Sequence, residues 1–259
     1  MSTFADRCVL VTGGGTGIGQ AIALAFARAG ASVVVSGRTR STLDVTVRLI
    51  EAGGGAAAAF VADVRRAEEV AGMVDFAASS FGRLHVAVNN AGIAAPALTA
   101  DIAEEDWNDV IGVNLTGVWL CMKYEITYLL TQGGGEIVNV GSILGRHASV
   151  IGMASYSASK AGLASLTRTA AREYVRQGIR INAVSPGPIE TPSSPVPDDE
   201  PVAPEDSLET QIDKHLMDAI AAGRAGTPEE VAAAVLWLAS PAASLAVGLD
   251  LVLDGGSVA

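Results

Sequence analysis

The sequence has little of what secreted, membrane-spanning or nucleic-acid-binding proteins need. Its 259 residues include two cysteines, too few for a disulfide framework, and no apolar run approaches the roughly 20 residues that span a bilayer. The sequence has only 17 lysines and arginines but 28 aspartates and glutamates, and the resulting net charge of −11 would repel a phosphate backbone. The first residues lack the basic and apolar regions of a signal peptide. We therefore expect a reduced, cytoplasmic protein without a nucleic-acid or membrane partner.

Metal-binding patterns are also missing. The three histidines, His85, His147 and His215, are far apart in the sequence, and neither His-x-x-x-His nor Cys-x-x-Cys occurs. Because zinc and other transition metals need several such ligands at defined spacings, no metal site is expected.

The chain does contain a regular alternation of short apolar runs and longer helical patterns. Strands are expected at 7–12, 32–36, 57–62, 86–88, 136–140, 179–184 and 249–253. Helices are expected up to residue 28 and at 41–52, 66–81, 104–130, 153–177, 208–222 and 228–238. Strands that are apolar on both faces are typical of a parallel sheet covered by helices on both sides. We predict a doubly wound α/β fold in a single domain, 1–259, interrupted by a proline-rich loop at 186–206.

A glycine-rich turn joins the first expected strand to the first helix. Gly13 suits the tight turn, Gly17 would let the backbone approach a pyrophosphate, and Gly19 would let the helix pack closely on the strand. This strand, turn and helix predict a dinucleotide site, since the helix N-terminus would face the phosphates.

The residues after the second expected strand bear on which dinucleotide binds. An NAD site would place an acidic residue there for the ribose 2′-hydroxyl, whereas this chain has Gly37, Arg38 and, two residues on, Arg40. A guanidinium can pair with a 2′-phosphate, so NADP(H) is favoured. If Arg38 is only a solvated surface residue, NAD(H) remains the alternative.

Tyr156 and Lys160 are four residues apart in a helical pattern, which places them on one face. A neighbouring ammonium favours the ionised phenol, so Lys160 is expected to lower the pKa of Tyr156 toward the range useful for acid/base catalysis. The alternative is an exposed polar pair with no catalytic role.

With these residues, several short motifs make the sequence resemble the short-chain dehydrogenase/reductase family over essentially its whole length. The motifs are TGGGTGIG at 12–19, Asp63-Val64, Asn89-Asn90-Ala91-Gly92, Asn114, Ser142, YSASK at 156–160, Pro186-Gly187 and Asp254-Gly255-Gly256. The resemblance implies a Rossmann-type fold and direct hydride transfer between a nicotinamide and a carbon atom.

The resemblance also implies a catalytic tetrad. Tyr156 would exchange a proton with the substrate oxygen, and Ser142 would hydrogen-bond the same oxygen. Lys160 would hold the nicotinamide ribose, and Asn114 would position a water that feeds a proton relay through Lys160.

The cofactor contacts expected from the turn and from the resemblance are spread along the chain. They are Gly13, Gly15, Thr16, Gly17, Ile18, Gly19, Arg38, Asp63, Val64, Asn90, Ala91, Gly92, Tyr156, Lys160, Pro186, Gly187, Ile189 and Thr191. Relatives with an arginine at the position of Arg38 usually take NADP. Thr16 departs from the pattern, because some NADP-specific relatives carry a second basic residue there.

The expected function is therefore NADP(H)-dependent, reversible hydride transfer on a ketone or secondary alcohol. An NAD-dependent dehydrogenase of a secondary alcohol, diol or polyol is the alternative, and a catalytically silent nucleotide-binding scaffold is a further one. The resemblance implies a substrate lid at about 190–222 and a homotetramer, or a homodimer, built through the helices at 104–130 and 153–177 and the last strand. Arg146 and His147 would either recognise a polar substrate group or lie on the surface.

Overall fold

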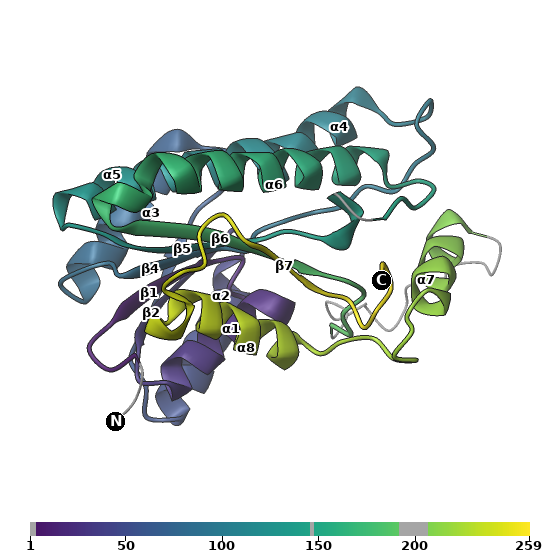
Figure 1. Cartoon of the computed structure of the whole chain (residues 1–259). Helices are drawn as coiled ribbons and strands as arrows, with labels where there is room; N and C mark the ends of the chain where they lie inside the picture. The colour runs from purple at the N-terminus through teal and green to yellow at the C-terminus, as the bar shows by residue number, and fades with distance from the viewer. Residues whose placement is uncertain (1–3, 146–147, 192–206) are drawn as a thin grey trace.

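The computed structural model describes residues 4–145, 148–191 and 207–259, and its centre is a parallel sheet of seven strands (Figure 1). The strands lie in the order β3-β2-β1-β4-β5-β6-β7. Their bounds are β1 (Cys8–Thr12), β2 (Ser32–Gly37), β3 (Ala57–Val61), β4 (Val86–Asn89), β5 (Gly135–Val140), β6 (Ile179–Pro186) and β7 (Asp250–Leu253).

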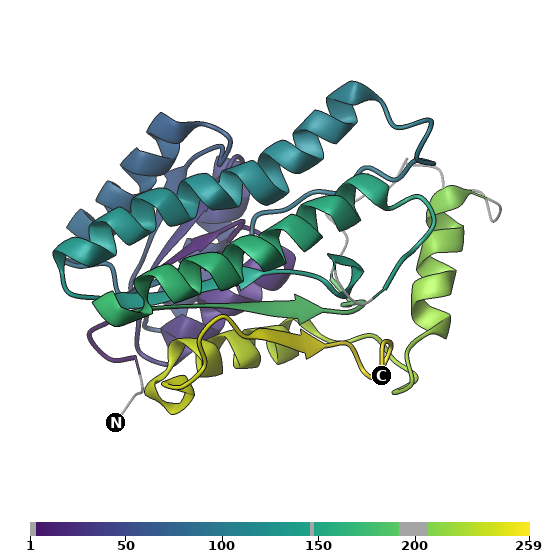
Figure 2. The same cartoon turned by 45° about the horizontal axis from the view of Figure 1, so that its top comes forward.

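Helices cover both faces of the sheet, and Figures 1 and 2 show the two layers. One layer contains α1 (Gly17–Arg28), α2 (Arg40–Ala52) and α8 (Pro228–Ala239). The other contains α3 (Ala67–Ser80), α4 (Glu104–Ile111), α5 (Val118–Thr131) and α6 (Ala154–Tyr174). A further helix, α7 (Leu208–Asp218), lies beyond the carboxyl ends of β6 and β7. The predicted doubly wound, Rossmann-type α/β fold is confirmed.

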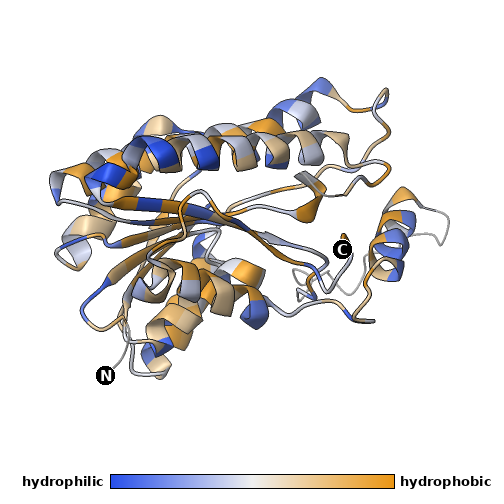
Figure 3. Cartoon of the chain, viewed as in Figure 1, coloured by the Kyte–Doolittle hydropathy of each residue, from blue (hydrophilic) through white to orange (hydrophobic). Residues whose placement is uncertain are grey.

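The central strands are buried on both faces, which explains their continuous apolar sequence. In β1, Val9 and Val11 pack with the α1 and α8 side of the core, whereas Cys8 and Leu10 pack with the α3 side. The strands are orange along most of their length in Figure 3, while blue residues lie on the outer helix faces. Because side chains alternate between two apolar layers, most positions in such a strand are apolar, and a buried polar residue there needs a hydrogen-bond partner.

Several boundaries differ from those expected from the sequence. The helix predicted at 104–130 is α4, then a π-helical segment, η1 (Gly112–Gly117), then α5. The helix predicted at 153–177 is α6 followed by a short 3₁₀ turn, η3 (Val175–Gln177), and the helix predicted to end at residue 222 ends at Asp218. Further 3₁₀ turns are η2 (Ile143–Gly145) and η4 (Pro241–Ala243).

Two parts of the sequence-based predictions fall on residues outside those described: most of the proline-rich loop, at 192–206, and the pair Arg146 and His147. Among the described helices, none is long and apolar enough to cross a membrane.

Candidate active site

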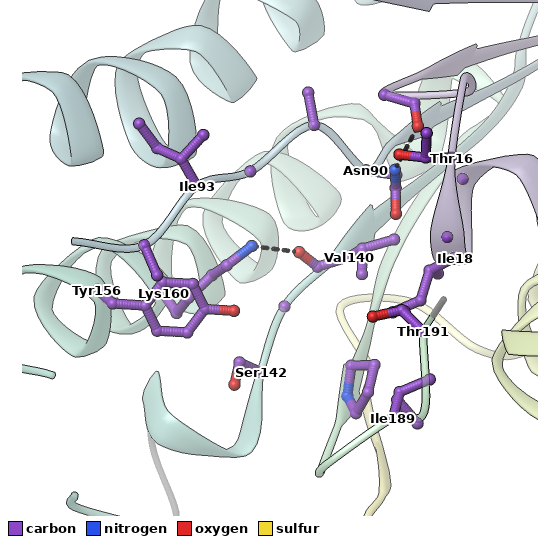
Figure 4. A pocket seen from close by; sticks show the side chains of 18 of the residues that line it. Thr16, Ile18, Asn90, Ile93, Val140, Ser142, Tyr156, Lys160, Ile189 and Thr191 are labelled. Carbon is purple, nitrogen blue, oxygen red and sulfur yellow. Dashed lines mark hydrogen bonds between the residues drawn. The ribbon is translucent and has the colours of Figure 1, made fainter. Parts of the chain in front are cut away.

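The predicted site residues gather at the carboxyl edge of the sheet, where the strand order changes direction between β1 and β4. In doubly wound sheets the crevice at this point is where ligands bind. A cavity of about 530 Å³ opens there, and Figure 4 shows the side chains that point into it. Its lining comes from the glycine turn after β1, the segment after β4, the end of β5, helix α6 and the segment after β6.

The glycine turn has the geometry that its sequence predicted. Gly13 and Gly17 have positive φ angles of 63° and 53°, which residues with a side chain rarely adopt. A Cβ atom on Gly19 would lie 2.1 Å from the carbonyl oxygen of Gly13, so only glycine lets α1 begin this close to β1. Gly15 faces α2 instead, because its Cβ would meet Thr42 Oγ1 at 2.5 Å. It is not among the residues that line the cavity.

Thr12 and Asn90 tie the ends of β1 and β4 together behind this turn. The Asn90 side chain donates to the carbonyl oxygens of Thr12 at 3.0 Å and Gly13 at 3.2 Å. The buried Thr12 hydroxyl accepts from the backbone amides of Asn90 at 3.0 Å and Ala91 at 3.1 Å. Thr12 was not among the predicted site residues, although a hydroxyl at the end of an otherwise apolar strand is a signal of such a role.

A second cavity of about 140 Å³ adjoins the first through Gly13, Ala91, Gly92 and Ile93, which line both. Its other lining residues include Gly37, Arg38, Asp63 and Val64. Of the two arginines after β2, Arg38 lines this cavity, whereas Arg40 pairs with Asp44 on α2 at 2.7 Å.

Asp63 is held in this second cavity as a carboxylate. Arg65 donates to it from two nitrogens, at 2.7 Å from Nη2 and 3.0 Å from Nε. The hydrogen bond from Arg65 lowers the pKa of Asp63, and the charge of Arg38 lowers that pKa further. A carboxylate beside Gly37 and Val64 is a hydrogen-bond acceptor at the place where the resemblance puts the adenine.

Tyr156 and Ser142 meet on the cavity wall. Burial raises the pKa of Tyr156, and a hydrogen bond from Ser142 lowers that pKa. The expectation that Lys160 brings the phenol toward its ionised form is wrong for the protein alone. The Lys160 ammonium lies 5.6 Å from the centre of the Tyr156 ring and donates to the Val140 carbonyl oxygen at 2.8 Å (Figure 4). Desolvation of the phenol therefore decides the direction of the shift.

Lys160 is 4 % exposed, and burial lowers its pKa to about 8. The group is still a cation at neutral pH, and its bond to Val140 fixes it at the end of β5. A buried ammonium in such a position can bind two oxygens of a ligand at once, since it has three donors and uses one on Val140.

Asn114 is fully buried in η1 and is fixed on both sides. Its Oδ1 accepts from the Ile93 amide at 2.9 Å, and its Nδ2 donates to the Ile93 carbonyl at 2.9 Å and to Ser159 Oγ at 3.1 Å. A Cβ atom on Gly92 would lie 3.4 Å from Asn114 Oδ1 and 3.6 Å from Lys160 Nζ, so these two groups border one small space.

The remaining predicted contacts also line the main cavity. They are Thr16, Ile18, Asn90, Ala91, Gly92, Pro186, Gly187, Ile189 and Thr191. Ile93, Val140 and Gly141 also line it but were not predicted, because apolar side chains and backbone carry no polar signal in the sequence. In the described parts of the chain, no three acidic, histidine or cysteine side chains could hold a metal ion.

Comparisons with known proteins define the class. Residues 13–257 match a family model described as enoyl-(acyl carrier protein) reductase. Two similar curated proteins are a 3-oxoacyl-[acyl-carrier-protein] reductase from Thermotoga maritima and a cis-4-hydroxycyclohexanecarboxylate dehydrogenase from Sinomonas cyclohexanicum. The first is 39% identical over 97% of this chain and 98% of its own length, and the second is 43% identical over 99% and 98%.

A solved structure of a short-chain dehydrogenase from Burkholderia cenocepacia, in complex with NADP, covers 99% of this chain and 100% of its own with a TM-score of 0.88 and 33% identity. The chain belongs to the short-chain dehydrogenase/reductase family. It is an oxidoreductase that acts on CH–OH or C=O groups with NAD(P).

Proposed function

We propose that the protein is an NADP(H)-dependent ketone reductase and secondary-alcohol dehydrogenase in which Tyr156 is the acid/base. The observation that carries this proposal is that a single cavity is lined both by the glycine turn and by Ser142, Tyr156 and Lys160. A dinucleotide with its phosphates at the turn therefore has its other end beside the phenol. A relative named 3-oxoacyl-[acyl-carrier-protein] reductase and the NADP in the Burkholderia structure support the same function.

The residues of the two cavities fit such a cofactor. The amide groups at the start of α1 would meet the pyrophosphate, and Arg38 would meet the 2′-phosphate, beside Asp63 and Val64 at the adenine. Asn90, Ala91, Gly92, Pro186, Gly187, Ile189 and Thr191 would line the rest of the cofactor. When bound, the nicotinamide supplies or accepts the hydride. Lys160 would hold its ribose hydroxyls, because the ammonium has donors to spare.

Proton transfer would fall to Tyr156. The phenol is protonated at neutral pH, as an unperturbed tyrosine is, and burial raises its pKa further, so it can donate to the oxygen of a ketone. Ser142 would donate a hydrogen bond to the same oxygen, which stabilises the negative charge that develops there. Asn114 and Lys160 would return a proton to the phenol through a water. We place ketone reduction first because Arg38 at the second cavity favours NADP(H).

The substrate would lie on an apolar wall. Ile143, Leu144 and Met153 form a cluster with Ile212 of α7, and Tyr156, Leu208 and Leu216 pack against it. We propose that residues 190–222 form the substrate lid of a single domain, 1–259. The packing of α7 against the loop that follows Ser142 supports this proposal. A partly hydrophobic carbonyl or alcohol suits such a wall.

The test is turnover of NADPH with a panel of ketones, including 3-oxoacyl thioesters and cyclohexanones, in the wild type and in Tyr156→Phe. We expect kcat to fall at least ~100-fold in Tyr156→Phe because the proton donor is lost, while the affinity for NADPH is retained. Tyr174→Phe, on the same helix and outside the cavity, is the control and should turn over normally. Full activity of Tyr156→Phe would refute the mechanism.

An NAD-dependent dehydrogenase of a secondary alcohol, diol or polyol is the second candidate. It is favoured by the 43% identity to the cis-4-hydroxycyclohexanecarboxylate dehydrogenase and by 41% identity to a cyclohexanol dehydrogenase from Acinetobacter. Tighter binding of NAD(H) than of NADP(H), with alcohol oxidation as the faster direction, would establish it. Binding of a dinucleotide without turnover of any alcohol or ketone would favour a silent scaffold.

We also propose a homotetramer, with a homodimer as the alternative, located in the cytoplasm. Trp107 on α4 and Trp119 on α5 are 42% and 46% exposed, and such large apolar side chains on the two helices support an interface there. Both cysteines are buried and free, in keeping with a reducing compartment. Light scattering measures the mass of the assembly in solution and so tests its oligomeric state. We expect Trp119→Glu to lower that mass.

A further inference from the structure

A buried carboxyl group lies in the interior between the sheet and helix α5, and nothing in the proposed mechanism uses it. Glu125 is 0% exposed. Its Oε2 accepts from Asn89 Nδ2 at 3.0 Å, whereas no partner is found for Oε1 in the described structure. Asn89 Oδ1 is likewise buried without a donor. Two neighbouring groups therefore each have one unpaired acceptor oxygen, and an unpaired buried acceptor is costly.

Glu125 is one end of a buried chain of hydrogen bonds that joins four elements. Asn89 on β4 also donates to Asn139 Oδ1 on β5 at 3.0 Å. Asn139 Nδ2 donates to Thr167 Oγ1 on α6 at 2.9 Å and to Met122 Sδ on α5 at 3.2 Å. Thr167 donates in turn to the Leu163 carbonyl at 2.8 Å. The network thus fixes β4 and β5 relative to the two helices above them.

The network ends one residue short of the candidate active site on two strands. Asn89 directly precedes Asn90, whose side chain holds the glycine turn. Asn139 directly precedes Val140, whose carbonyl accepts the Lys160 ammonium at 2.8 Å. A shift of either asparagine would move a group that lines the cavity.

The surroundings of Glu125 offer no countercharge in the described chain. Burial raises the pKa of Glu125 to about 7, and the Asn89 hydrogen bond opposes this. On α5 itself the facing ionisable group is the Cys121 thiol, whose pKa is raised well above its usual value by burial and by Glu125. On α6 the buried cation is Lys160, which is bound to Val140.

The other elements packed on α5 contribute neutral side chains. From β6 these are Ile179 and Ile181, and from η1 they are Val113 and Asn114. The buried side chains of α3 are Val70, Met73, Val74, Ala77 and Ala78. An anion in this environment has one amide donor to compensate its desolvation, whereas a carboxylic acid has an O–H that can serve an unpaired acceptor.

We propose that Glu125 is held as the neutral carboxylic acid and is a positioning residue for the oxidoreductase site. As a donor and an acceptor at once, it completes the network through Asn89 and Asn139, and so keeps Asn90 and the Val140 carbonyl in place. Lys160 is positioned indirectly, through Val140. The proposal rests on the proposed role of Lys160 in holding the cofactor.

The first test needs no cofactor. Glu125→Gln replaces the acid by a neutral amide of the same shape with both a donor and an acceptor. For a carboxyl whose pKa is raised on folding, stability is full below the unfolded value and is lost as pH rises through the folded value. We therefore expect the wild type to lose stability against Glu125→Gln between about pH 4.5 and pH 7, in urea unfolding. If the difference in stability between the wild type and Glu125→Gln is constant over this range, the proposal that Glu125 is a neutral acid is overturned.

The second test compares Glu125→Ala with Leu129→Ala, a cavity variant on the same helix outside the network. We expect Glu125→Ala to lower kcat roughly tenfold and to weaken NADPH binding, and Leu129→Ala to leave both unchanged at matched stability. We also expect Glu125→Gln to rescue kcat and to remove the fall in wild-type kcat that ionisation of Glu125 causes above about pH 7.

Equal kinetic effects of the two alanine variants would overturn the positioning role. Failure of the wild type to bind NADPH or NADH would overturn the proposed function and the positioning role with it. The stability comparison would then still decide whether Glu125 is neutral, so the two failures are distinguishable.

Discussion

Arg38 should decide which dinucleotide the protein prefers, and replacing it gives a measurable prediction. The guanidinium is exposed at the rim of the second cavity, beside Gly37 and Asp63. Arg40, two residues on, is also exposed but pairs with Asp44 at 2.7 Å. Arg38→Ala therefore removes the cation of the cavity, and Arg40→Ala removes a similar charge outside it.

The expected loss of NADPH binding free energy in Arg38→Ala follows from the hydrogen bonds that Arg38 would make to the 2′-phosphate. One hydrogen bond to a charged group contributes about 1.5–3 kcal/mol. A bidentate pair makes two such bonds, but solvent screens them at an exposed rim, so we expect the pair together to contribute about 1.5–3 kcal/mol. A loss of that size corresponds to a Kd for NADPH raised roughly 10- to 100-fold. NADH has no 2′-phosphate, so its Kd should stay within about twofold. The gap between the two dinucleotides should also narrow as salt rises.

Calorimetric titration of the apoprotein with NADPH and NADH measures both constants without a substrate. Wild type should bind NADPH more tightly, Arg38→Ala should lose that preference, and Arg40→Ala should keep it. If the wild type binds NADH more tightly, or if Arg38→Ala binds NADPH as before, the 2′-phosphate argument is refuted. The NAD-dependent alcohol dehydrogenase would then be the better proposal.

Three further predictions concern the glycines and the lysine of the main cavity. Gly19→Ala should abolish cofactor binding in calorimetry, because its Cβ would lie 2.1 Å from the Gly13 carbonyl oxygen and displace the start of α1. Gly92→Ala should bind cofactor but turn over about tenfold more slowly in steady-state assays. Its methyl group would lie 3.4 Å from Asn114 Oδ1 and 3.6 Å from Lys160 Nζ, in the space that we propose for the relay water. A normal kcat would count against the relay. Burial lowers the pKa of Lys160 from 10.5 to about 8. The contribution of Lys160 to the free energy of unfolding is therefore full above pH 10.5 and is lost as pH falls through 8. Relative to Lys160→Met, the wild type should gain up to about 3 kcal/mol from pH 8 to pH 10.5 in urea unfolding, and a flat difference would contradict the shift.

The sequence by itself determined the fold class, the glycine turn and the common helix face of Tyr156 and Lys160. Strands that are apolar on both faces exclude a half-exposed sheet, and the helix that follows the turn places the glycines at the carboxyl end of β1. Tyr156 and Lys160 share a helix face because they are four residues apart. These features depend on neighbours within a few residues of each other, which is why a linear pattern reveals them.

Only the tertiary structure decided which polar groups are buried, and with which partners. The resemblance singled out Arg38, but only the fold shows that Arg38 lines the cavity while Arg40 pairs with Asp44, and that Glu125 is buried beside Asn89 of β4. The rise in the pKa of Tyr156 also depends on the tertiary structure. The sequence places a cation four residues away, but the fold turns that cation toward Val140 and removes the phenol from water. Desolvation depends on everything that surrounds a group, and most of those atoms come from distant parts of the chain.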